Sequence, residues 1–110
     1  MATSIERVRR FALSLPESAE APHHHMSSYR VRGKIFATVP PGGELLHVFV
    51  DDERRELALA MDPSAYENLH WGKKVVGVRV HLGHAAHDDV KDLLLCAWRR
   101  KAPKSIARDR

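Results

Sequence analysis

The pattern of apolar and polar residues from 29 to 50 predicts a three-stranded antiparallel meander, whose second and third strands are apolar on both faces. A tight turn is expected at Arg32-Gly33, because glycine permits a backbone conformation that other residues resist. The third strand is expected after the Pro-Pro-Gly-Gly loop of residues 40–43. Since successive side chains of a strand point to opposite faces, the alternation divides the meander into two sets. The predicted core set is Tyr29, Val31, Ile35, Ala37, Val39, Leu46, Val48 and Val50, and the predicted outward set is Arg30, Arg32, Lys34, Phe36, His47 and Phe49.

Three other segments carry apolar residues at three- and four-residue spacing, which predicts helices over residues 4–15, 51–61 and 84–101. Thr3 and Glu6 have capping-box spacing for the first helix, and Pro16 ends it. Its arginines lie off the apolar face and are expected to be solvated. Residues 51–61 also show some strand-like alternation, but their Ala, Leu, Glu and Arg content favours a helix.

A second hairpin is predicted from residues 65–71 and 74–80, with its turn at Gly72-Lys73. Within it, Gly77 has no side chain, so another part of the chain is expected to pack closely there. The predicted order is helix, three strands, helix, two strands and helix, with residues 17–22 as a loop. The simplest assembly is a two-layer α+β fold, in which a five-stranded antiparallel sheet carries its helices mainly on one face.

The composition fits one globular domain, with 44% hydrophobic and 29% charged residues among 110. We place that domain at residues 1–103, followed by a basic C-terminal tail, residues 104–110, that is expected to be mobile. The formal net charge is +4, and six of the residues from 99 to 110 are basic while one is acidic. This charge is compatible with a nucleic-acid partner.

Neither an apolar run long enough for a membrane span nor the apolar block of a signal peptide occurs in the sequence. Cys96 is the single cysteine, so an intrachain disulfide is excluded. These features predict a cytoplasmic protein.

The histidine run of residues 23–25 invites a metal interpretation, but in an extended chain its side chains alternate between two faces. Two co-facing histidines are fewer than the three protein ligands usual for catalytic zinc, so no metal site is expected. No nucleophile–base pair or phosphate-binding loop can be identified, and Cys96 lies on a helix expected to be buried. We therefore predict a protein that is not an enzyme and has no cofactor.

Several short pieces, in this order, resemble those of the MmcQ/YjbR family of small bacterial proteins. They are Ala-Leu-Ser-Leu-Pro-Glu at residues 12–17, Tyr-Arg-Val-Arg-Gly-Lys-Ile-Phe-Ala at 29–37, Gly-Val-Arg-Val at 77–80, Trp98, and Ala-Pro-Lys at 102–104. The resemblance implies a compact α+β domain similar to bacterial CyaY and to secretion chaperones, of a double-wing type described as DNA-binding. One departure is Met26-Ser27, which stands where family members often have a His-Pro pair.

Two functions follow as hypotheses. The first is a DNA-binding module that contacts phosphates through basic strand, turn and helix-end residues. Its predicted contacts are Arg30, Arg32, Lys34, Lys73, Lys74, Arg79, Arg99, Arg100, Lys101 and Lys104. The alternative is a protein-interaction or chaperone-like adaptor, or a homodimer, that uses an apolar outer sheet face. Its predicted surface is Phe36, Leu45, His47, Phe49 and Trp71.

Overall fold

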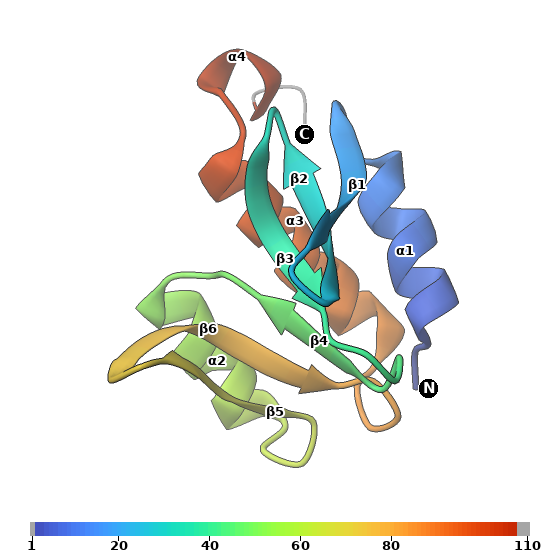
Figure 1. Cartoon of the computed structure of the whole chain (residues 1–110). Helices are drawn as coiled ribbons and strands as arrows, with labels where there is room; N and C mark the ends of the chain where they lie inside the picture. Colours follow the sequence, from blue (N-terminus) through green and yellow to red (C-terminus); the bar gives the residue numbers. More distant parts are fainter. Residues whose placement is uncertain (1, 108–110) are drawn as a thin grey trace.

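Six antiparallel strands form one sheet in the computed structural model, which describes residues 2–107. Their spatial order is β1-β2-β3-β4-β6-β5 (Figure 1). The strands are β1 (Ser18–His23), β2 (Met26–Val31), β3 (Lys34–Val39), β4 (Leu45–Val48), β5 (Tyr66–Trp71) and β6 (Lys74–His81). The helices are α1 (Ile5–Ser14), α2 (Asp52–Met61), α3 (His87–Lys101) and α4 (Lys104–Ala107).

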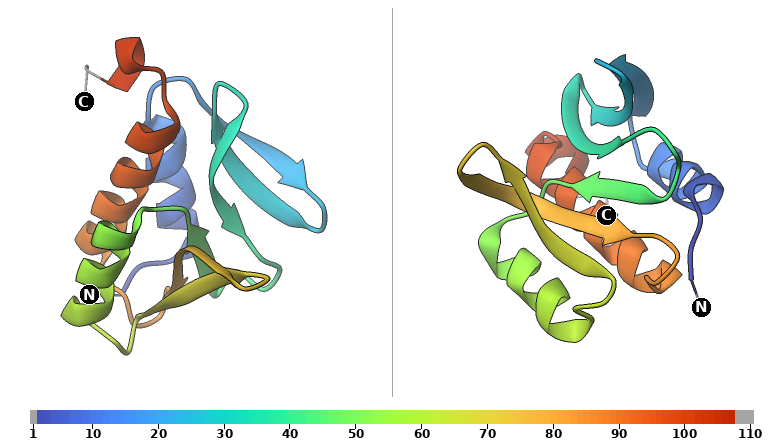
Figure 2. Two further views of the ribbon diagram at one scale, coloured as in Figure 1. Left: turned by 90° about the vertical axis from the view of Figure 1, so that its left-hand side faces the viewer. Right: turned by 60° about the horizontal axis from the view of Figure 1, so that its bottom comes forward.

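The three longer helices cover one face of the sheet, and the strands splay apart on the opposite side (Figure 2). The central helix α3 packs along β3 with α1 beside it, while α2 lies against β5 and β6. The apolar face of α3 is buried as the sequence predicts: Val90, Leu93, Leu94, Ala97 and Trp98 are all in the core. The α+β architecture is thus confirmed, but the sheet has six strands rather than the five predicted.

The additional strand is β1, in a segment whose sequence pattern predicts a loop. It pairs with β2 from Ser18 opposite Val31 to His23 opposite Met26, at the edge of the sheet. Its residues include Pro22 and have low β-propensity, which explains why the pattern gives no strand signal. Pairing with β2 compensates, because alternate residues of an edge strand exchange backbone hydrogen bonds with the neighbouring strand. The His24-His25 turn closes the hairpin, with His24 at a φ of 58°.

The predicted faces of β3 are wrong at Phe36 because the strand contains a β-bulge. Tyr29 pairs with Ala37 and Arg30 with Ile35, so Phe36 has no counterpart on β2. A bulge shifts the alternation of side chains by one position. Phe36, predicted to point outward, is therefore completely buried together with Ala37, whereas Ile35 of the predicted core set is only half-buried.

The first helix begins one residue later than the predicted capping box. Ser4 is the N-cap, and its side chain accepts a hydrogen bond from the backbone N–H of Arg7. Thr3 is instead buried, with its hydroxyl 2.7 Å from Nδ1 of His87 and its backbone N–H bonded to the carbonyl of Ala85. The N-terminal segment is thus attached to the start of α3.

Two glycine-dependent predictions are confirmed. The β2–β3 turn has positive φ at both Arg32 and Gly33, 51° and 81°, as a two-residue turn between twisted strands requires. At Gly77, a Cβ would lie 2.1 Å from the carbonyl oxygen of Val48, so β4 and β6 approach there as closely as only glycine allows.

The predicted C-terminal tail starts with a helical turn. Residues Lys104–Ala107 form α4, and Ile106 is buried against the domain with 7% of its surface exposed. The folded body therefore includes residues 104–107. The rest of the predicted tail, residues 108–110, lies outside the described residues. Across residues 2–107, no helix has the length and apolar character needed to cross a membrane.

Candidate functional surfaces

A row of polar side chains crosses the sheet face opposite the helices. Thr38 of β3 pairs with His47 of β4, His47 with Arg79 of β6, and Arg79 with Glu67 of β5, so all four project to the same side. The hydroxyl of Thr38 lies 3.4 Å from Nδ1 of His47, and Nε of Arg79 donates to Nε2 of His47 over 3.3 Å. Arg79 also donates to a Glu67 oxygen at 3.0 Å, and the second oxygen of Glu67 is 2.9 Å from Nε2 of His81.

Burial and neighbouring groups shift the pKa values of His47 and Glu67 in this row. Burial lowers the pKa of His47, and the positive charge of Arg79 lowers it further. The hydrogen bond with His81 holds the pKa of Glu67 below its ordinary value. His47 thus favours the neutral form, with Nε2 accepting from Arg79. The sequence marks His47 and Arg79 as separate candidates but gives no signal that links them, because strand order decides their contact.

Arg30 continues the polar row toward the edge of the sheet. Its Nε donates to the hydroxyl of Ser28 over 3.0 Å, and Nη2 donates to the carbonyl of Pro22 over 3.2 Å. Ser28 is completely buried and donates in turn to the carbonyl of Ala21. The guanidinium of Arg30 therefore braces the β1–β2 hairpin, in addition to the phosphate-contacting role predicted for it.

The apolar partner surface predicted from the sequence is not continuous. Phe36 is in the core, so it cannot reach a partner. Leu45 and Phe49 are half-buried, and the polar side chain of His47 stands between them along the chain. Trp71 is 80% exposed and ends β5, at the far edge of the sheet from β1.

Six of the predicted phosphate-contacting residues lie at one end of the molecule. The β2–β3 turn and α4 both lie toward this end, beyond the last turn of α3 (Figure 1), and Figure 2 shows that a gap separates them. We call this region the basic end, and it consists of Arg32, Lys34, Arg99, Arg100, Lys101 and Lys104.

Two of its arginines have partners that hold them in place. Arg32 forms a two-contact ion pair with Glu17, at 2.5 and 3.1 Å. Arg100 donates to the carbonyl of Phe49 over 2.9 Å. Lys34 and Lys104 are exposed to solvent. The basic end therefore combines fixed guanidinium groups with freely presented ammonium groups.

Of the four remaining predicted residues, Arg30 lies on β2, and the other three lie on the β5–β6 hairpin, away from the basic end (Figure 1). Lys73 and Lys74 are exposed at its turn, and Lys74 pairs directly with Trp71 across the two strands. Arg79 belongs to the polar row described above. The structure thus divides the ten predicted contacts among the basic end, this turn and the outer sheet face.

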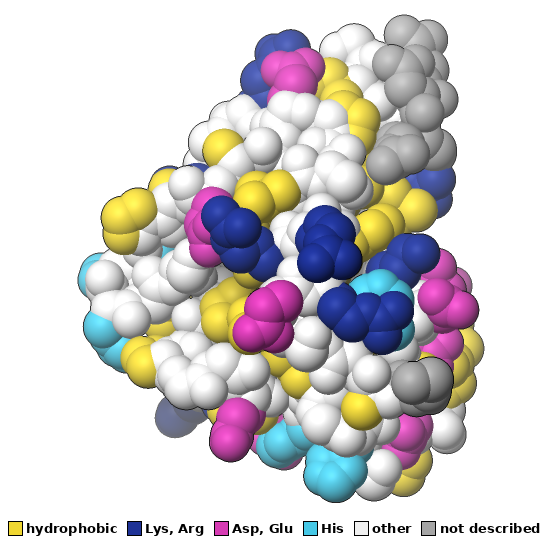
Figure 3. Space-filling view, turned by 90° about the vertical axis from the view of Figure 1, so that its right-hand side faces the viewer, with side chains coloured by type: hydrophobic (Ala, Val, Ile, Leu, Met, Phe, Trp, Pro, Cys, Tyr) yellow, Lys and Arg dark blue, Asp and Glu magenta, His cyan; other side chains and the backbone are white. Residues whose placement is uncertain are grey.

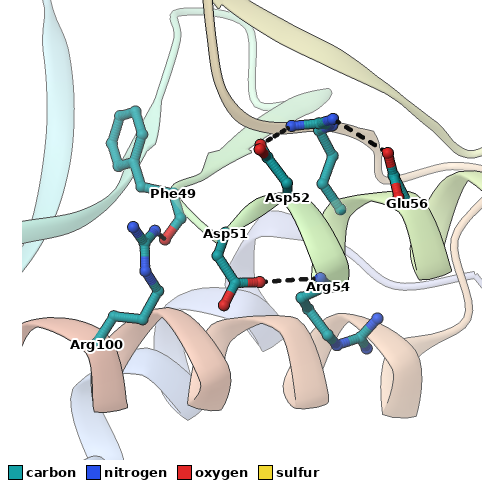
Figure 4. A network of polar contacts seen from close by, with 7 residues as sticks. Phe49, Asp51, Asp52, Arg54, Glu56 and Arg100 are labelled. Carbon is teal, nitrogen blue, oxygen red and sulfur yellow. Dashed lines mark hydrogen bonds and ion pairs between the residues drawn. The ribbon is translucent and has the colours of Figure 1, made fainter.

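A shallow hollow of about 460 Å³ separates the start of α2 from the last turns of α3, and Arg54, Cys96, Arg99 and Arg100 line it. Asp51 caps α2 by accepting from the backbone N–H of Arg54 at 2.9 Å (Figure 4). Burial raises the pKa of the Cys96 thiol, and the nearby charge of Asp51 adds to this effect. A thiol that resists ionisation is a poor nucleophile, so Cys96 suits a packing role.

The exposed side of α1 carries Arg7, Arg9 and Arg10, but acidic side chains are interspersed among the basic ones (Figure 3). Arg9 forms an ion pair with Glu20 of β1 at 2.7 Å, and both side chains are partly exposed. This mixed surface agrees with the solvated role expected for these arginines.

The histidine run is split by the first hairpin. His23 ends β1, while His24 and His25 form the turn. Within residues 2–107, no group of three or more His, Cys, Asp or Glu side chains is arranged to hold a metal ion.

Comparisons with known proteins agree with this architecture. The family model YjbR matches residues 13–100. The crystal structure of Deinococcus radiodurans protein DR2400, described as a DUF419 domain, superposes with a TM-score of 0.76 and 20% sequence identity. The match covers 99% of this chain and 88% of that one. No curated protein matches the sequence significantly.

Proposed function

We propose that this chain, which belongs to the YjbR family, is a cytoplasmic, non-enzymatic module that binds DNA through the phosphate backbone. The observation that carries the proposal is the basic end, where the fold gathers six of the ten phosphate-contacting residues expected from the sequence. They come from segments more than 60 positions apart, Arg32 and Lys34 on one side and residues 99–104 on the other. The end thus carries an excess of positive charge, with Glu17 offsetting that of Arg32.

The chemistry of the basic end fits phosphate rather than base recognition. Lysine ammonium groups act as mobile point charges, and the arginines add planar donors. Contacts of this kind position a protein on nucleic acid without reading its sequence, and each phosphate neutralised releases counterions. Binding is therefore expected to weaken steeply with salt and to vary little with DNA sequence.

The non-enzymatic part of the proposal rests on how the candidate acid–base groups are engaged. One hydrogen-bonded row engages these side chains. Arg79 links His47 to Glu67, and Glu67 contacts His81 directly. The Cys96 thiol is half-buried, and its pKa is raised by burial. The hydrogen-bonded row belongs to the sheet, whereas Cys96 lies on α3, so we infer no nucleophile–base pair among them.

The test is a fluorescence anisotropy titration of labelled duplex DNA at two salt concentrations. We expect the double variant Lys34→Gln/Lys104→Gln to bind about tenfold more weakly and to lower the salt slope by about two. The control is Arg7→Gln/Arg10→Gln on α1, which removes the same charge from a different surface. Absence of wild-type binding at low salt would refute the proposal, as would an equal loss in both variants.

A second function, a protein-interaction adaptor, has one specific observation in its favour. Leu57 and Met61 lie one turn apart on α2 and are 52% and 53% exposed, so they form an apolar surface on the helix that flanks β5 and β6. This is a different place from the outer sheet face predicted by the sequence. Sedimentation analysis of Leu57→Lys tests whether the surface mediates self-association: a wild-type dimer that the substitution dissociates would favour this function.

A further inference from the structure

Trp71 is the most exposed large apolar side chain among residues 2–107, with 80% of its surface accessible. The other tryptophan, Trp98, is completely buried, and its indole N–H donates to the carbonyl of Pro16 over 3.1 Å. An indole contributes one of the largest apolar areas that folding can bury. Tryptophan is enriched at contact surfaces, and the exposed indole of Trp71 leaves this apolar area available to a binding partner.

The β5–β6 turn holds this indole between positive charges. Trp71 ends β5 and pairs directly with Lys74, which begins β6. The two residues between them are Gly72, whose φ of 62° allows the tight turn, and Lys73, whose side chain is exposed. One flat aromatic surface and two ammonium groups thus occupy four consecutive positions at a protruding tip (Figure 2).

We propose that the β5–β6 tip binds single-stranded nucleic acid, with the Trp71 indole stacked on an unpaired base and Lys73 and Lys74 contacting the adjacent phosphates. Bases in a duplex are stacked on one another, so their faces are inaccessible to an indole, whereas a single strand exposes them. Stacking on an aromatic side chain tolerates any base, because every base has a π-face. The lysines favour this partner over a protein, since lysine is depleted in protein–protein interfaces.

This site is separate from the basic end and does not depend on it. The six residues of the basic end are all basic and include no aromatic side chain. They can contact the phosphates of single-stranded and duplex nucleic acid alike. The β5–β6 tip adds a preference for unpaired strands. The two sites lie on different parts of the surface, so substitutions can separate their contributions (Figure 1).

The experiment measures anisotropy with a labelled single strand of about ten nucleotides and with the same sequence as a duplex. We expect Trp71→Ala to weaken single-strand binding about tenfold and to leave duplex binding within about twofold. Trp71→Phe is expected to recover part of the loss, because a phenyl ring still stacks. Asn68→Ala, at an exposed position of the same strand β5, is the control and is expected to change neither.

Intrinsic fluorescence provides a second measurement that does not depend on net affinity. Since Trp98 is buried, quenching of the exposed indole by the single strand is expected in the wild type and absent in Trp71→Phe. The inference is overturned if Trp71→Ala binds the single strand as the wild type does. It is also overturned if the substitution weakens duplex and single strand equally. In either case the role of the basic end is tested separately, by the double variant Lys34→Gln/Lys104→Gln.

Discussion

Arg79 donates a hydrogen bond from Nε to Nε2 of His47, 32 residues away in sequence and adjacent across the β4–β6 pair. The bond requires an unprotonated Nε2, because a protonated imidazole has only donors on its ring nitrogens. Protonation of His47 would replace an acceptor with a positive charge facing the guanidinium of Arg79. Glu67 is the acidic group that faces the same pair.

The first prediction concerns pH. The pKa of folded His47 lies below its ordinary value of 6.5, so the unfolded chain binds the proton more readily than the folded one. The free energy of unfolding should therefore fall as pH decreases from about 7.5 to about 5.5. In His47→Gln this loss should be smaller. Urea unfolding at both pH values measures it, with His70→Gln on the exposed side of β5 as the control. An identical pH response in His47→Gln and wild type would contradict the assignment.

The second prediction concerns the close approach of β4 and β6 at Gly77. Gly77→Ala places a Cβ against the carbonyl of Val48, and two backbones must separate to accept it. We expect the free energy of unfolding to fall by about 2 kcal/mol or more. Gly83→Ala is the matched control, because nothing lies within 4 Å of a Cβ there, and it should cost less than about 0.5 kcal/mol. Chemical denaturation measures both, and similar values would contradict the geometry.

The third prediction separates the bulged register of β3 from the regular alternation. With Phe36 in the core, Phe36→Ala should lower the free energy of unfolding by about 3–5 kcal/mol. If Phe36 were a surface residue, the change would be comparable to that of Leu57→Ala, which should stay within about 0.5 kcal/mol. Thermal unfolding of the two variants distinguishes the registers directly.

The fourth prediction tests whether α4 belongs to the folded body. Ile106 is 7% exposed, so Ile106→Ala should lower the free energy of unfolding by about 2 kcal/mol through lost apolar burial. Lys104→Ala, at an exposed position of the same helix, should have almost no effect on stability. If Ile106→Ala unfolds at the wild-type denaturant concentration, residues 104–107 do not contribute to the core.

The sequence by itself determined the elements whose signals are local. The positions of α2 and α3, the Arg32-Gly33 turn and the β5–β6 hairpin follow from periodicity, helix-end charges and glycine, which act within a few residues. The close contact at Gly77 could also be predicted, because a glycine inside a strand often marks a place where another backbone approaches closely. The family resemblance came from the order of these same pieces.

Only the tertiary structure decided the features that depend on pairing between distant segments. Strand β1 exists because β2 offers it hydrogen bonds, although its own residues favour no strand. The bulge buries Phe36 because β3 pairs with β2 on one side and with β4 on the other. The alternation of residues along β3 alone carries no information about these two pairings. Strand order likewise brings His47, Glu67 and Arg79 into one row, and chain packing gathers the basic end. The polar row and the basic end belong to this second group, since each combines side chains from several strands or helices, whereas the β5–β6 tip lies within one predicted hairpin.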